Sequence, residues 1–225
     1  MYVDRIMTRD VVTVTEETKL PRLAELMRER KLRHLPVVDA AGRLLGIVSH
    51  RDVQRAEPSP ITTLDVGEVN YLLSKVTAGK LMHREVITAT PGMLVEEAGC
   101  LMRDRRVGCL PVVDGECLVG IVTGVDLVDF FLEVTGCQVV DAARIAVHLP
   151  DEVGRLAGLL AAVNRAGGKI ATVVSPTHPD ETGQRIAIVR YRADDLQGVI
   201  DALRGAGYDI VTVNFPDDSD DRGCI

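Results

Sequence analysis

A short apolar block occurs twice in this chain and constrains its fold more than any other feature. Residues 33–39 read RHLPVVD, and residues 108–114 read GCLPVVD. Each block is followed by a second matching stretch, GIVS before Asp52 and GIVT before Asp126. A tandem repeat of this length predicts two copies of one supersecondary unit. Two related halves also predict one or two clefts where they meet.

Composition and charge limit the classes of function. The chain is 46% hydrophobic but only 3% aromatic, so its cores must consist of Val, Leu, Ile and Ala. A net charge of −7 argues against general nucleic-acid binding, which needs a basic surface. No apolar run approaches the roughly 20 residues of a membrane helix, and the first residues lack an apolar signal segment. We therefore predict a cytoplasmic protein with no nucleic-acid and no membrane partner.

The polar side chains give little support for catalysis or metal binding. No C-x-x-C pair, phosphate-binding P-loop, G-x-S-x-G or paired-His motif is present. Three histidines, His83, His148 and His178, have no acid–base partner nearby in the sequence. We expect ordinary buried thiols rather than disulfides or metal ligands, no catalytic residue and no metal site. The five cysteines are Cys100, Cys109, Cys117, Cys137 and Cys224.

Each repeat predicts the same mixture of strands and helices. In the first, strands are expected at 11–14, 35–38 and 44–48, with a helix that starts close to Thr18 and a second helix capped by Ser49. In the second, strands are expected at 86–88, 110–113 and 117–122, with a helix that starts at Pro91 and a further helix from Asp126. A linking helix is expected at 66–74. The pattern predicts two similar α+β units packed face to face.

Residues from about 142 onward predict a different unit. Strands are expected at 144–148, 170–174, 185–192 and 210–213. Between them lie two predicted helices. The apolar face of the first comprises Val153, Leu156, Ala157, Leu160 and Ala161, and that of the second comprises Leu196, Val199, Ile200 and Leu203. The order βαββαβ is the ferredoxin-like pattern.

Ser/Thr-x-x-Asp after a strand is the most informative polar motif. The strand delivers Ser49 to a helix N-terminus, where backbone N–H groups favour an anion such as phosphate. Asp52, one turn on, can accept hydrogen bonds from a diol such as that of ribose. The plainer alternative is that Ser49 and Thr123 only cap helices, and that Asp52 and Asp126 are acids favoured by the helix dipole.

These motifs resemble those of a known family. Met-Thr near the start of the first repeat, L-P-V-V-D, G-R-L-L-G-I-V and Ser/Thr-x-x-Asp make residues 1–133 similar to a pair of CBS domains, also called a Bateman module. Residues 142–214 resemble an ACT domain, and the whole order resembles the acetoin-utilisation AcuB-like proteins. The resemblance implies an α+β CBS pair followed by a ferredoxin-like ACT domain. The implied boundaries are 1–56 and 76–134 for the CBS domains, 57–75 for the linker, 141–215 for the ACT domain and 216–225 for an acidic flexible tail.

The resemblance also implies a ligand. CBS pairs bind AMP, ADP, ATP or S-adenosylmethionine in clefts between the two domains, as a regulatory ligand rather than a cofactor, with or without Mg²⁺. One cleft would use Ser49, Asp52, Ile87, Val107, Gly108 and Cys109. The other would use Thr123, Asp126, Val12, Leu32, Arg33 and His34.

The two implied clefts differ in charge. The first repeat places Arg33, His34, His50 and Arg51 where they can face phosphates, whereas the corresponding positions of the second repeat carry no cation. Guanidinium groups bind phosphate through bidentate contacts. We therefore predict that the Asp52 cleft is the better di- or triphosphate site. The alternative is that the histidines are ordinary surface groups.

The remaining expectations concern the second unit and the whole protein. A turn formed by Asp151, Val153, Gly154 and Leu156 resembles the ACT segment where an amino acid can bind at a subunit interface, and Gly154 alternatively only permits close packing. We predict a regulatory homodimer that senses adenine nucleotides, acts on an unknown regulated protein and has a link to acetoin utilisation. The alternatives are an enzyme with a nucleotide-dependent interfacial site and an oligomerisation scaffold that binds no ligand.

Overall fold

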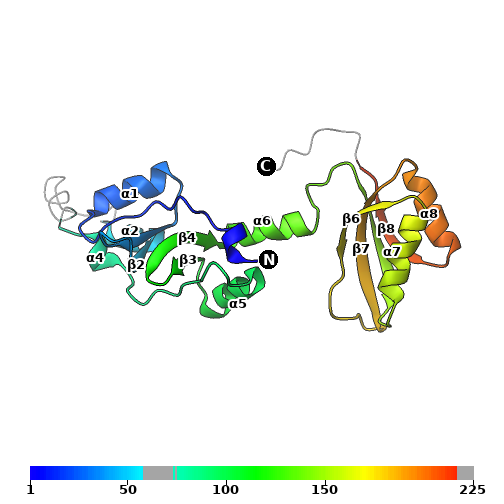
Figure 1. Cartoon of the computed structure of the whole chain (residues 1–225). Helices are drawn as coiled ribbons and strands as arrows, with labels where there is room; N and C mark the ends of the chain where they lie inside the picture. The colour runs from blue at the N-terminus through cyan, green and yellow to red at the C-terminus, as the bar shows by residue number, and fades with distance from the viewer. Residues whose placement is uncertain (58–72, 74, 217–225) are drawn as a thin grey trace. The chain divides into compact units, whose positions relative to one another are not determined.

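The computed structural model describes residues 1–57, 73 and 75–216, and divides the chain into two compact units, Met1–Val128 and Asp129–Ile225 (Figure 1). The first contains both repeats, and each unit is described by itself. The predicted linking helix at 66–74 lies outside the described residues apart from Leu73, as does Cys224 in the acidic tail. Among the described residues we find no helix with both the length and the apolar character needed to traverse a bilayer.

Each repeat is built around one antiparallel hairpin with helices before and after it. Short continuous runs of apolar side chains form the hairpins, and Pro36 pairs with Ile47 in the first as Pro111 pairs with Ile121 in the second. The first repeat contains α1 (Leu20–Glu29), β1 (His34–Val38), β2 (Leu44–Ser49) and α2 (His50–Ala56). The second contains α5 (Val95–Arg105), β3 (Cys109–Asp114), β4 (Cys117–Thr123) and α6 (Gly124–Val134).

The first predicted strand of each repeat is reduced to one residue. Val14 makes a single parallel bridge to Val37, and Ala89 makes the equivalent bridge to Val112. The predictions of strands at 11–14 and 86–88 are therefore wrong, because only Val14 of the first segment pairs with a hairpin and Ala89 lies one residue beyond the second. The predicted helix start close to Thr18 is confirmed, since α1 begins at Leu20, whereas the predicted start at Pro91 is too early, since α5 begins at Val95.

The two repeats exchange their leading segments. Val3 and Met7 are buried in the core of the second repeat with Leu110 and Val122, and the short helix η1 (Val3–Arg5) is part of this segment. Conversely, the equivalent segment with α4 (Ala78–Leu81) is buried in the core of the first repeat with Leu35 and Val48. The residues that precede each repeat in the sequence therefore pack in the core of the other repeat. Neither core is complete without them.

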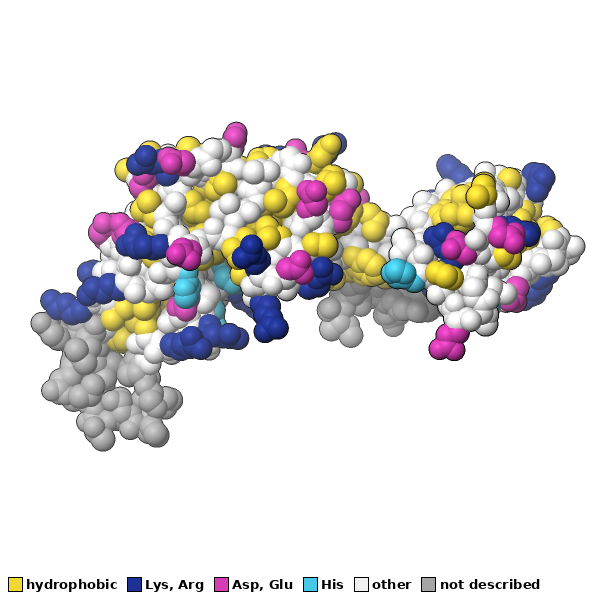
Figure 2. Space-filling model, turned by 90° about the horizontal axis from the view of Figure 1, so that it is seen from below, with side chains coloured by type: hydrophobic (Ala, Val, Ile, Leu, Met, Phe, Trp, Pro, Cys, Tyr) yellow, Lys and Arg dark blue, Asp and Glu magenta, His cyan; other side chains and the backbone are white. Residues whose placement is uncertain are grey.

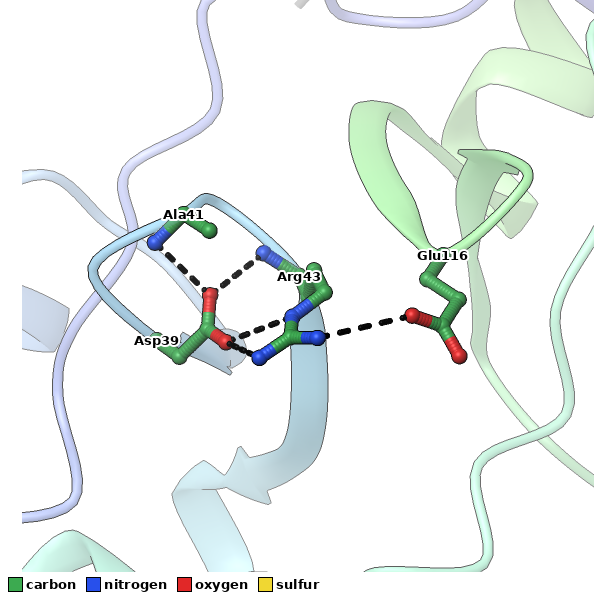
Figure 3. A network of polar contacts seen from close by, with 4 residues as sticks. All are labelled: Asp39, Ala41, Arg43 and Glu116. Atoms are coloured by element: carbon green, nitrogen blue, oxygen red, sulfur yellow. Dashed lines mark hydrogen bonds and ion pairs between the residues drawn. The ribbon is translucent and has the colours of Figure 1, made fainter.

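The turns of the two hairpins are tied together. Leu44 donates its N–H to the carbonyl of Glu116 (3.1 Å), and Leu118 donates to that of Gly42 (3.0 Å). Arg43 bonds the Asp39 carboxylate and reaches Glu116 of the other repeat at 3.7 Å (Figure 3). Hydrogen bonds from the backbone and side chain of Arg43 hold the pKa of Asp39 below its usual value.

We expect Arg43→Ala to change the free energy of unfolding by less than about 1 kcal/mol, because exposed ion pairs are screened by water. The Arg43 side chain is 54% exposed, and the two backbone hydrogen bonds between the turns remain in the variant. Urea unfolding of the variant and the unsubstituted chain measures the difference. A loss of several kcal/mol would show that this ion-pair network, and not the hydrophobic cores, joins the repeats.

The second unit has the predicted βαββαβ order. It comprises β5 (Ala143–Pro150), α7 (Arg155–Arg165), β6 (Lys169–Val174), β7 (Gln184–Arg192), α8 (Leu196–Gly205) and β8 (Asp209–Asn214). The antiparallel sheet has the order β6-β7-β5-β8, the ferredoxin-like arrangement. Both helices pack against this sheet (Figure 1). Tyr191 lies fully buried in the core and donates its hydroxyl to the carbonyl of Leu196 at 2.9 Å.

The buried face of α7 differs from the predicted one. Leu159 and Val163 are fully buried, while Ala157 and Ala161 are exposed and Val153 lies before the helix, exposed to solvent. The predicted apolar face counted Ala157 and Ala161 equally with Leu and Val. Burying Leu or Val removes more apolar surface from water, so the helix turns its larger side chains toward the core. The α8 prediction is confirmed, since Val199, Ile200 and Leu203 are its buried residues.

Candidate functional site

The Ser-x-x-Asp motif forms a capping box at the N-terminus of α2. The Asp52 oxygen Oδ2 accepts hydrogen bonds from the Ser49 N–H (2.9 Å) and hydroxyl (2.5 Å). Thr123 and Asp126 make the same pair of contacts at α6, at 2.6 and 2.7 Å. The capping alternative is therefore realised in both repeats. Because α2 has only seven residues and carries its own carboxylate at its N-terminus, phosphate is not expected to bind there.

The second oxygen of Asp52 is held by the other repeat. The His83 ring nitrogen Nε2 lies 3.2 Å from Asp52 Oδ1. Burial pushes the pKa of Asp52 upward, but hydrogen bonds from Ser49 and His83 outweigh it, so the pKa lies below its ordinary value. Asp52 is consequently ionised at neutral pH. His83 has no acid–base partner nearby in the sequence, and the fold supplies one, Asp52, from the other repeat.

A cavity of about 860 Å³ lies beside this pair and is walled by both repeats. Its volume is in the usual range for small-molecule sites. Imidazole and basic side chains gather on this face of the paired-repeat unit, cyan and dark blue in Figure 2. The first repeat contributes Arg33, His34, Ile47, Ser49, His50, Arg51 and Gln54; the rest are His83, Glu85, Val86, Ile87, Arg106, Val107, Gly108, Cys109 and Pro111.

The charge of the cavity wall is strongly positive. Within the described residues, the guanidinium groups of Arg33, Arg51 and Arg106 make no ion pair, and Glu85 is the one acid of the wall. Burial, and then the charge of Arg33, lower the pKa of His34 below its ordinary value. His34 is therefore neutral at pH 7, and the arginines supply the charge. Such a wall suits an anion, with Arg preferred for phosphate.

Most of the residues predicted for the Asp52 cleft meet in this cavity. The lining includes Ser49, Ile87, Val107, Gly108 and Cys109. Asp52 does not line the cavity itself but bonds His83, which does. Arg51 lines it as well. Arg33 and His34 also line this cavity; the family resemblance implied both for the other cleft, whereas the comparison of charges predicted that they can face phosphates.

Arg106 was missed by the sequence analysis. It stands immediately before Val107, at the position that Lys31 holds in the first repeat, and both have left-handed backbones, with φ of +55° and +53°. The comparison of charges covered only the positions that correspond to Arg33, His34, His50 and Arg51, where the second repeat carries no cation, and therefore did not extend to Arg106. A basic residue at the same place in both repeats is the signal that could have found it.

The remaining residues of the predicted second cleft are placed separately. Val12 and Leu32 are partly buried against the core of the first repeat. Asp126 binds Thr123 at the start of α6. Its oxygen Oδ1 has no protein partner within the described part of the chain.

The expectation of buried thiols holds for Cys109 and is wrong for the other three described cysteines, Cys100, Cys117 and Cys137, which are exposed. Burial raises the pKa of Cys109 to about 12, so its thiol is a poor nucleophile. Cys100, Cys117 and Cys137 are free thiols, and no cluster of potential metal ligands occurs in the described residues.

At the turn before α7, the four predicted residues are not gathered around one point. Asp151 pairs with Arg185 at 3.1 Å, and Leu156 packs against the core. Val153 is exposed to solvent. Gly154 has φ of +85° and open space around its absent Cβ, so backbone conformation and not close packing favours glycine there.

Comparison with known proteins decides the family of the paired-repeat unit. The family model for the CBS domain matches residues 3–59 and 78–133, which together make up half of the chain. The chain belongs to the CBS-domain family. Its two repeats are a tandem pair of CBS domains with an α+β fold.

Several relatives share this CBS pair. A CBS domain-containing protein of Dictyostelium discoideum is 32% identical over 135 residues, covering 60% of this chain and 93% of its own length. Homoserine O-acetyltransferase of Methanohalophilus mahii is 30% identical over 124 residues, and the match spans only 23% of that enzyme and 55% of this chain. The enzyme name therefore belongs to a much longer protein.

Two solved structures resemble the CBS pair. A candidate acetoin utilization protein (AcuB) of Vibrio cholerae has a TM-score of 0.52 at 33% identity, covering 61% of this chain and 95% of that one. CBSX2, solved in complex with AMP, has a TM-score of 0.50 at 28% identity and covers 59% and 96% of the two chains. At least one similar CBS pair thus binds an adenosine ligand.

Proposed function

We propose that the CBS pair binds a phosphorylated adenosine ligand, such as AMP, ADP or ATP, in the cavity beside Asp52. The observation that carries the proposal is a cavity lined by three arginines that make no ion pair within the described residues and by His83, which bonds the ionised Asp52. The arginines suit phosphate, and Asp52 suits a ribose diol through its outward oxygen. The apolar groups of Ile87, Val107 and Pro111 suit the faces of an adenine ring. AMP in the similar CBSX2 structure supports the same ligand class.

The proposed role is regulatory and not catalytic. Bound nucleotide would shift the protein between two arrangements by its differential affinity for them, and an unknown partner protein would respond. The similarity to AcuB of Vibrio cholerae extends the proposal to acetoin utilisation. Mg²⁺, where present, would arrive with the phosphates of the nucleotide. Turnover of ATP or acetoin by the purified protein would contradict this role and favour an enzyme.

We further propose that the ferredoxin-like unit is an ACT-type domain that associates with a second copy. The βαββαβ order and the sheet order β6-β7-β5-β8 support it. The exposed turn at Asp151–Gly154 would then take an amino acid at the interface between copies. Thermal shifts of the full chain with individual amino acids test for that ligand, and light scattering tests for the dimer.

We expect ATP in large excess to stabilise the CBS pair, Asp52→Ala to weaken ATP binding by no more than about threefold, and Asp126→Ala to leave it unchanged. A ligand at 100 times its Kd stabilises the folded state by about 2.7 kcal/mol. Both carboxylates cap a helix, so the loss of the cap is matched between the two variants. A thermal-shift panel of AMP, ADP, ATP and S-adenosylmethionine identifies the ligand, and titration calorimetry measures the variants.

The outcomes separate the candidate functions. No thermal shift with any adenine ligand would leave a scaffold without a ligand as the better interpretation. Equal losses of affinity in the two variants would contradict the preference for the Asp52 cleft. Tighter binding of S-adenosylmethionine than of ATP would contradict a site built for phosphate.

A further inference from the structure

His83 is delivered to Asp52 by a rigid contact between the repeats. Its N–H and carbonyl form a two-way bridge with Ile47 of β2, at 2.9 and 3.0 Å. A Cβ on Gly46 would lie 2.9 Å from the His83 carbonyl oxygen, so the segment rests directly on the strand. The backbone of His83 is therefore fixed, and its ring stands beside Asp52 without needing a ligand.

The second repeat supplies an internal comparison. Thr8 bridges Ile121 of β4 through the same two hydrogen bonds, both 2.9 Å, and the strand glycine there is Gly120, which Met7 approaches as Met82 approaches Gly46. Thr8 therefore occupies beside Asp126 the place that His83 occupies beside Asp52. The Thr8 side chain makes no hydrogen bond to Asp126 in the described residues.

The two carboxylates consequently differ in one respect. In both, oxygen Oδ2 is taken by the capping hydroxyl and N–H. His83 holds Oδ1 of Asp52 at 3.2 Å, whereas Oδ1 of Asp126 has no donor among the residues that the structure describes. The Asp52 side chain is 13% exposed and the His83 side chain 67% exposed, so the imidazole can turn away while the carboxylate stays.

We infer that His83 is the specificity-determining residue of the Asp52 cleft and lowers its selectivity for the ribose diol. This inference rests on the proposed function. A diol that binds Oδ1 must first displace the imidazole, so one hydrogen bond replaces another and the net gain is small. Phosphate binding by the arginines is unaffected. The Asp52 cleft thus accepts phosphorylated nucleosides whether or not the ribose hydroxyls are present, while a cleft built like that of Asp126 discriminates against deoxyribose ligands.

The test compares ATP with 2′,3′-dideoxy-ATP by calorimetry on the full chain, in an Asp126→Asn background that leaves the Asp52 cleft intact. With His83 present, we expect loss of both hydroxyls to weaken binding by less than about threefold. In His83→Thr, Oδ1 of Asp52 has no partner before the ligand binds, so the ribose diol adds a hydrogen bond without displacing one. Removing both hydroxyls is then expected to weaken binding about tenfold or more. The penalty is a ratio within one protein, so a general loss of stability does not produce it.

Three control variants sharpen the result. His83→Gln keeps an N–H donor and is expected to restore the small penalty. Arg84→Thr alters the adjacent residue, which pairs with Glu16, and is expected to leave the penalty unchanged. In an Asp52→Asn background, Thr8→His should lower the penalty of the Asp126 cleft. Equal penalties with and without His83 overturn this inference alone, whereas failure of the unsubstituted chain to bind ATP overturns the proposed function and the inference with it.

Discussion

The double variant Arg33→Ala, Arg51→Ala is expected to bind ATP about 100-fold more weakly than the unsubstituted chain. Both guanidinium groups line the cavity and neither is neutralised by a carboxylate in the described residues. Each charge-assisted hydrogen bond to phosphate contributes about 1.5–3 kcal/mol, and about 1.4 kcal/mol corresponds to a tenfold change in affinity. Titration calorimetry at one fixed ionic strength measures the loss.

This prediction has two controls: adenosine as a ligand without phosphate, and Arg55→Ala as a variant that removes an arginine outside the cavity. Adenosine carries no phosphate, so its affinity is expected to stay the same in the double variant. Arg55 lies in the last turn of α2 and does not line the cavity, so its removal is expected to leave ATP binding intact. If ATP and adenosine lost affinity by the same factor, the arginines would be supporting the cavity wall and not binding phosphate.

Gly46→Ala is expected to destabilise the CBS pair by about 1–3 kcal/mol, the usual cost of forcing an extra methyl group into a packed interior. An added Cβ would lie 2.6 Å from the Met82 sulfur and 2.9 Å from the His83 carbonyl oxygen. The backbone atom cannot move away without breaking the bridge to Ile47. Urea unfolding followed by circular dichroism measures the change.

Gly92→Ala is the control for that prediction, since open space surrounds its absent Cβ. We expect it to change the free energy of unfolding by no more than a few tenths of a kcal/mol. Equal stability of the two alanine variants would show that the segment around His83 adapts, and the fixed delivery of His83 to Asp52 would then be wrong.

The hairpins and caps were predictable because their signals are local. The repeated LPVVD and GIV stretches are short apolar runs bounded by turn residues, and Asp114-Gly115 is a strong turn dipeptide. Ser49 and Asp52 stand at capping-box spacing, and the structure shows that box. The ferredoxin-like order followed in the same way from four strand patterns and two helical faces.

The pairing of His83 with Asp52 was not predictable in this way. The two residues are 31 positions apart and belong to different repeats, so no periodicity links them. The single-residue bridges of Val14 and Ala89 were missed for a related reason, because a β-branched run predicts a strand whether or not a partner strand is available. Which cavity Arg33 and His34 line likewise depends on how the repeats face each other, and no local pattern in the sequence specifies that.

The exchanged leading segments have a practical consequence for handling this protein. Deleting the first eight residues would remove Val3 and Met7 from beneath β3 and β4, and would spare the hairpin that follows those residues in the chain. Cutting the chain between the repeats would likewise yield two fragments. Each would have an incomplete hydrophobic core and would carry the segment that completes the core of the other. Mixed in solution, such fragments should recover structure only together, as a split reporter does.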